Sequence, residues 1–323
     1  MKRSLPLLAV IVGIAWSAAT AQMSETGSFL AKLGRDTIAV EQYTMDAREL
    51  QGTSIARSPQ TTVRTYQATF GPQGILERFH VSYQRFGGTR EFAVLSGRRI
   101  FRYEVRGSSP GSLELANPDR DFGPLYAKIG KNGRLDRFDM TATTDKFVVQ
   151  RVSRINLQAV GRSFAEREST GHAFGALSPR DTVRATVNGA HIMIDYGRPS
   201  MRGRTIFGKV VPWNEVWRTG ANAATQLITD KELVSGTTKV PAGTYSLFTL
   251  PSENTWMLII NGQHGQWGTV YDQTKDLARI PLKVTRLKNP VERFTFEISS
   301  REREGVLQFK WERMEASIPF RVQ

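Results

Sequence analysis

Cysteine is absent from all 323 residues of the chain. This absence excludes disulfides, thiolate metal ligands and cysteine nucleophiles, so the folded state must be held by packing and hydrogen bonds. Histidine is also scarce: the four present, His80, His172, His191 and His264, form no HxH or HExxH pattern. We therefore predict no metal site, and no nucleotide-binding glycine loop points to a cofactor.

Long hydrophobic runs are missing as well. The longest, residues 5–16, follows Lys2 and Arg3 and precedes a segment that contains Ala19 and Ala21. A basic start, a short apolar run and a small-x-small site are typical of a cleaved secretory signal, and the run is shorter than the roughly 18 residues of a membrane-spanning helix. We expect residues 1–21 to be removed after Ala21. The mature chain would then be extracytoplasmic, in the periplasm or secreted, with no transmembrane segment.

Acidic residues are the minority among the charged ones. The chain has 44 Lys and Arg against 30 Asp and Glu, which gives a formal net charge of +14. A basic exported protein favours anionic surfaces or acidic ligands, but arginines spread over a solvated surface are the favoured explanation of the excess. No basic stripe or nucleic-acid-binding module is present, so we expect no nucleic-acid partner.

The pattern along the chain predicts an all-β protein with two domains. Apolar and polar residues alternate in short runs that are separated by glycine, proline and asparagine, and no long segment has helical periodicity. We predict an N-terminal antiparallel meander or half-barrel over residues 22–161, a linker over residues 162–180 and a C-terminal jelly-roll-like β-sandwich over residues 181–323. Within the last, Asn188 and Gly189 separate two alternating runs, which predicts a tight hairpin.

Three segments of the C-terminal half have distinctive sequences: YGRPSMRGRTIFG from Tyr196, VPWNEVWRTGANAAT from Val211 and VPAGTYSLFTLP from Val240. With Trp267-Gly268 and Tyr271-Asp272, they resemble the bacterial family known as domain of unknown function 2911. The resemblance implies an exported β-rich domain and supplies no activity or catalytic residue. The N-terminal half is only loosely similar to the open β-half-barrels of envelope lipoprotein carriers.

These segments also contain the predicted ligand-binding cluster, which consists of Arg198, Arg204, Trp217, Arg218, Asn222 and Thr225. Guanidinium groups bind carboxylate, phosphate or sulfate with two parallel hydrogen bonds, and an aromatic ring beside amide and hydroxyl groups suits a sugar-like molecule. The alternative is structural: the arginines would pair with carboxylates such as Asp195 and Glu215 and lock the loops.

The favoured hypothesis is a periplasmic or secreted binding module for an anionic or carbohydrate-like small molecule or an envelope component. The N-terminal domain would then be a β-rich partner or a cradle for an apolar ligand. A second hypothesis is a cell-envelope hydrolase that uses Glu215, Asp272 or His264, and a third is a structural or assembly protein. Enzymatic activity is the less favoured interpretation, and the sequence leaves the ligand and the oligomeric state open.

Overall fold

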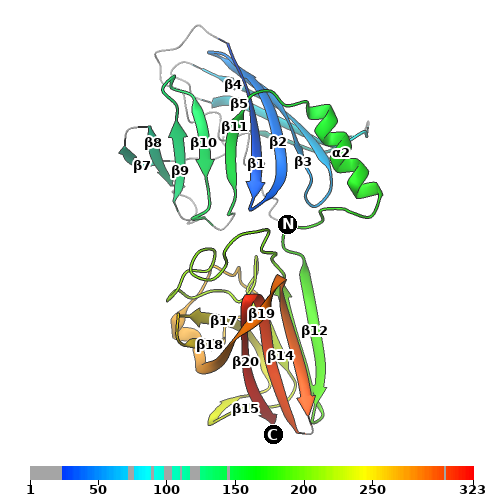
Figure 1. Ribbon diagram of the computed structural model, residues 1–323, viewed down its shortest axis with the longest axis vertical. Helices are drawn as coiled ribbons and strands as arrows, with labels where there is room; N and C mark the ends of the chain where they lie inside the picture. Colours follow the sequence, from blue (N-terminus) through cyan, green and yellow to red (C-terminus); the bar gives the residue numbers. More distant parts are fainter. Residues whose placement is uncertain are drawn as a thin grey trace. The chain divides into compact units, whose positions relative to one another are not determined.

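The computed structural model describes residues 24–71, 76–88, 91–97, 104–109, 111–116, 124–143, 146–301 and 303–323. The predicted signal, residues 1–21, and its cleavage site lie outside these residues. The chain forms two compact units, residues 1–176 and residues 177–323. Each unit is built on an antiparallel sheet, which confirms the all-β prediction (Figure 1).

Unit 1, residues 1–176, is an eleven-stranded open sheet in the described part of the chain. Its order is β6-β5-β4-β3-β2-β1-β11-β10-β9-β8-β7, so two meanders meet where β1 pairs with β11. The strands are β1 (Glu25–Leu33), β2 (Asp36–Met45), β3 (Glu49–Ala56), β4 (Thr62–Phe70), β5 (Leu76–Arg85), β6 (Glu91–Gly97), β7 (Glu104–Ser109), β8 (Ser112–Ala116), β9 (Leu125–Ile129), β10 (Leu135–Asp139) and β11 (Val148–Val152).

The two faces of this sheet differ because side chains alternate along each strand. One row across five strands, Ala31, Val149, Phe138, Ala127 and Leu113, is apolar, and its first four members are buried. We call the face with this row the core face. The opposite face of β1–β5 holds mainly serine, threonine and glutamine, and we call it the polar face.

Helix α2 (Leu157–Ser169) lies within unit 1. Asn156 caps it by accepting a hydrogen bond from the Ala159 amide at 2.9 Å. At its other end Glu168 accepts a bond from the Thr61 amide at 2.8 Å and pairs with Arg85. The sequence predicted no long helix, and the predicted linker of residues 162–180 contains most of this one. The helix buries only Gly161 fully, so its apolar stripe is too weak to be recognised in the sequence.

Unit 2, residues 177–323, is a nine-stranded arrangement with the order β12-β13-β14-β17-β18-β19-β20-β15-β16. Its elements are β12 (Arg180–Val187), β13 (Ala190–Gly197), β14 (Thr225–Thr229), β15 (Leu233–Ser235), β16 (Thr238–Val240), β17 (Gly243–Pro251), β18 (Trp256–Asn261), the 3-10 turn η3 (Gln273–Lys275), β19 (Asp276–Arg301) and β20 (Glu304–Val322). The β12–β13 hairpin turns at Asn188 and Gly189, both with positive φ, as this residue pair predicts.

The core of unit 2 lies between two layers. One consists of β12, β13, β14, β17 and β18, and the other is the long hairpin β19–β20 with β15 and β16 beside β20. Tyr196 at the end of β13 packs edge-to-face on Phe294 and Phe296 of β19, although these strands are not neighbours in the sheet. The Tyr196 hydroxyl also accepts a bond from the Phe296 amide at 3.2 Å. Buried side chains from both parts therefore form one core, as in a two-layer sandwich.

Candidate functional site

The polar face of unit 1 carries ten hydrogen-bonding side chains in two straight rows. Each of the strands β1–β5 contributes one polar-x-polar pair, and the strand register aligns these pairs across the sheet. The exposed row consists of Thr26, Thr44, Gln51, Gln67 and the half-buried His80. The sheltered row consists of Ser28, Gln42, Thr53, Ser82 and Thr65, of which Thr65 alone is exposed.

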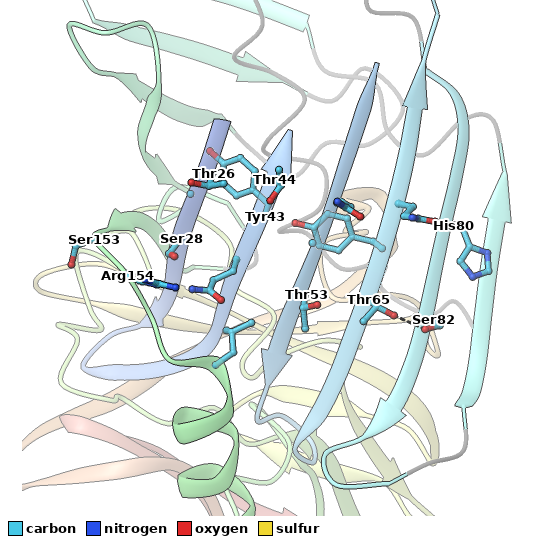
Figure 2. Close-up of a pocket in the computed structure, with 17 residues that line it drawn as sticks. Thr26, Ser28, Tyr43, Thr44, Thr53, Thr65, His80, Ser82, Ser153 and Arg154 are labelled. Carbon is cyan, nitrogen blue, oxygen red and sulfur yellow. Dashed lines mark hydrogen bonds between the residues drawn. The ribbon is translucent and has the colours of Figure 1, made fainter. Parts of the chain in front are cut away.

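These rows form the floor of a groove of about 870 Å³ (Figure 2). Residues 153–157, between β11 and α2, make one wall with Ser153, Arg154 and Leu157. Gln42 fixes this wall, because its side-chain amide donates to the Ile155 carbonyl at 2.6 Å. Figure 2 shows Arg154 beside Ser28 at one end of the rows and His80 at the other end.

Most of the floor has free hydrogen-bonding capacity. In the sheltered row Thr65 and Ser82 share a hydrogen bond at 2.7 Å. Six other floor residues make no side-chain hydrogen bond within the part of the chain that the structure describes; they are Thr26, Ser28, Thr44, Gln51, Thr53 and Gln67. Hydroxyl and amide groups both donate and accept, so this surface matches a ligand rich in hydroxyl groups. An apolar ligand, as the sequence suggested for this half, would leave these groups without partners.

The permanent charge of the groove is positive. Among the residues that the structure describes, none that lines the groove is Asp or Glu, and Arg154 is the one lining residue with a permanent charge. Arg154 is exposed and has no ion pair among the described residues. An acidic group on a ligand would therefore meet no carboxylate in the lining and one available guanidinium.

The core face beneath the groove supports its floor. Gly27 and Gly52 lie against the rings of Tyr43 and Tyr66, so a Cβ at either glycine would overlap a ring. The Tyr66 hydroxyl donates to the buried carboxyl of Glu41. Burial raises the pKa of Glu41 from its ordinary 4.5 to about 7, while the bond from Tyr66 and the nearby Arg64 act in the opposite direction.

In unit 2, the structure places Arg198 and Arg204 among intramolecular partners. Arg198 donates to the Asp181 carboxylate at 2.8 Å, to the Phe294 carbonyl at 3.2 Å and to the Thr295 hydroxyl at 3.0 Å. Arg204 donates to the Met201 and Ser200 carbonyls at 2.9 and 2.6 Å, and burial lowers its pKa. Their role in ligand binding stays a prediction.

Trp217 and Thr225 also have partners within unit 2. The Trp217 ring stacks on Trp311 at 5.9 Å, and its indole N–H donates to the Gly220 carbonyl at 3.2 Å. Thr225 is fully buried and donates to the Thr219 carbonyl at 2.7 Å.

Arg218 and Asn222 lie next to Gly268. The Arg218 side chain packs on Gly268, whose amide donates to the Asn222 carbonyl at 2.9 Å. The neighbouring Trp267 is 52 % exposed. The structure thus brings two members of the predicted cluster to a loop surface that also holds an exposed tryptophan.

No hydrogen bond or ion pair joins the hydrolase candidates Glu215, Asp272 and His264 to one another in the described chain. Glu215 and His264 are exposed. Asp272 begins η3 by accepting bonds from the amide and hydroxyl of Thr274 at 2.9 and 2.7 Å, which hold its pKa below the ordinary value. The described residues also contain no group of three or more His, Asp or Glu side chains placed to hold a metal ion. The catalytic assignment stays a prediction.

Unit 2 is an all-β sandwich. Two of the distinctive segments lie mainly in its loops, and the third, residues 240–251, mainly forms β17. A family model described as protein of unknown function (DUF2911) matches residues 178–320, which confirms the resemblance of the C-terminal half to this family. The N-terminal half, which contains the groove, has no family match. No curated protein matches the chain. Within the described residues, no helix has the length and apolar character needed to cross a membrane.

Proposed function

We propose that the protein is an extracytoplasmic binding protein that holds a carbohydrate-like ligand in the groove of unit 1. The observation that carries this proposal is the pair of aligned rows, in which six side chains have unused hydrogen-bonding groups. Sugar hydroxyls both donate and accept, so they satisfy such a surface without requiring a charged partner. The volume of about 870 Å³ accommodates several sugar rings.

A glycan array followed by calorimetry tests the proposal. The probes are cellohexaose, maltohexaose, chitohexaose and hexagalacturonate, applied to the mature chain. In the exposed row, Thr44→Val, Gln51→Leu and Gln67→Leu each remove hydrogen-bonding groups at nearly constant volume. Each change should weaken binding of the selected probe about fivefold, since one hydrogen bond contributes roughly 1 kcal/mol.

Thr186→Val is the matched control, because Thr186 is an exposed strand residue of unit 2. It should leave binding unchanged. The proposal fails if no array glycan binds, or if the triple variant of the exposed row binds as tightly as the natural protein.

A second candidate site, for an anionic ligand, is the loop surface of Arg218, Asn222 and Trp267 in unit 2. The exposure of the Trp267 ring beside a cation and an amide favours it. If this surface holds the ligand, Trp267→Ala should abolish binding while the three exposed-row changes have no effect.

Export is the other part of the proposal. The basic start, apolar run and small-x-small site at Ala19 and Ala21 support cleavage before Gln22. N-terminal sequencing of the protein purified from the periplasm or medium should begin at Gln22. An uncut chain found in the cytosol would contradict the assignment.

A further inference from the structure

We infer that the ligand of the groove is a linear acidic polysaccharide chain, which crosses strands β1–β5 with a carboxylate held by Arg154. This inference rests on the proposed function and specifies the shape and charge of the ligand.

The shape follows from the direction of the two rows. Each row runs over five neighbouring strands, so it spans four inter-strand spacings, or roughly 19 Å. In the direction of the strands, the floor is only as wide as one polar-x-polar pair, or roughly 7 Å. A surface that is long across the strands and narrow along them suits an extended chain of sugar rings better than a single ring.

The two rows provide different contacts to such a chain. Ser28 and Ser82, at the ends of the sheltered row, are only 4 % and 6 % exposed, whereas Thr44, Gln51 and Gln67 of the exposed row are open to solvent. Residues 153–157 border the sheltered row, where Gln42 binds the Ile155 carbonyl. The chain would therefore rest on the exposed row with one edge against this wall.

The charge follows from the asymmetry of the groove. Arg154 lies at the β1 end beside Ser28, and His80 lies at the β5 end. Within the described residues, Arg154 has no ion pair, and the lining contains no carboxylate that would compete for it or repel an acid. A planar guanidinium binds a carboxylate with two parallel hydrogen bonds, so a uronate ring at the β1 end would be favoured over a neutral ring.

Chain length and charge are tested with galacturonate oligomers of two to six rings and with their neutral methyl esters, by calorimetry at constant ionic strength. Affinity should rise with each ring up to about four rings and then level off, because the rows end. The acidic hexamer should bind about tenfold more tightly than its methyl ester.

Arg154→Gln should remove this tenfold preference and leave binding of the methyl ester unchanged. The matched control is Arg35→Gln, at an exposed arginine in the turn between β1 and β2, which should preserve the preference. Equal affinity for the galacturonate dimer and hexamer would overturn the inference that the ligand is a linear chain. Equal affinity for acid and ester, or a preference that survives Arg154→Gln, would overturn the acidic subsite. In these cases the changes in the exposed row still weaken binding, so the proposed function survives. The proposed function fails only if no array glycan binds or if the changes in the exposed row do not affect binding.

Discussion

Replacing Glu41 by Gln tests how the core face supports the groove. The Glu41 side chain is fully buried, Tyr66 donates to one of its oxygens, and the other oxygen has no partner among the described residues. Its pKa is about 7 in the folded state against 4.5 ordinarily. Because the folded value is the higher one, the stabilisation is complete below pH 4.5 and is lost as the pH rises through 7. The shift corresponds to about 3 kcal/mol at 1.36 kcal/mol per pH unit.

Glutamine keeps the oxygen that accepts from Tyr66 and cannot ionise. Glu41→Gln should therefore match the natural protein at pH 4 and exceed its free energy of unfolding by about 3 kcal/mol at pH 8. Urea unfolding followed by far-UV circular dichroism measures this difference. Tryptophan fluorescence is an internal control, because all five tryptophans after residue 21 lie between positions 213 and 311, in unit 2. An equal pH dependence in both proteins would refute the argument that the burial of Glu41 outweighs the compensation from Tyr66 and Arg64.

Two further predictions concern unit 2 and the segment of unit 1 that follows α2. Arg198→Lys and Arg204→Lys should each lower the free energy of unfolding of unit 2 by roughly 1–3 kcal/mol, because lysine cannot reproduce the several hydrogen bonds that each arginine makes. Urea unfolding followed by tryptophan fluorescence measures this change. Arg184→Lys, at an exposed arginine, is the control. Unchanged stability with weaker anion binding would instead support the ligand-binding prediction for these arginines. Subtilisin should cut first between residues 170 and 173, which are exposed, whereas Phe174 and Gly175 are held by Arg57 and the Ser58 hydroxyl. First cleavage inside either sheet would contradict two separable domains.

The strands were predictable because alternation is a local property. A run such as residues 182–187 alternates whether or not its partners are known, so the all-β class follows from the sequence. The Asn188-Gly189 turn was predictable for the same reason, because its φ requirement involves two adjacent residues. Helix α2 was not, because it buries only Gly161 and its apolar stripe is therefore weak, while the bond from the Thr61 amide to Glu168 joins residues far apart in the sequence.

The groove was missed because it depends on register. Thr26-x-Ser28, Gln42-x-Thr44 and the three similar pairs are each unremarkable in a half-exposed strand. They form a surface only when all four strand pairings align them, and a shift of one residue in any strand would move its pair to the core face. The recurrence of one such pair in each of five consecutive strands was the signal available in the sequence.

The distinctive segments of unit 2 illustrate the opposite case, in which a conspicuous pattern coincides with intramolecular contacts. Gly197 is required because a Cβ there would overlap the Ala221 carbonyl, and Arg198, next in sequence, is engaged by three partners. Thr225 bonds to the Thr219 carbonyl inside the same fold. Intramolecular contacts thus suffice to explain these residues, because buried polar groups must be satisfied whether or not a ligand binds. A ligand of unit 2 would have to rely on the side chains that reach its surface, above all Asn222 and Trp267, and this is why Trp267→Ala separates the two candidate sites.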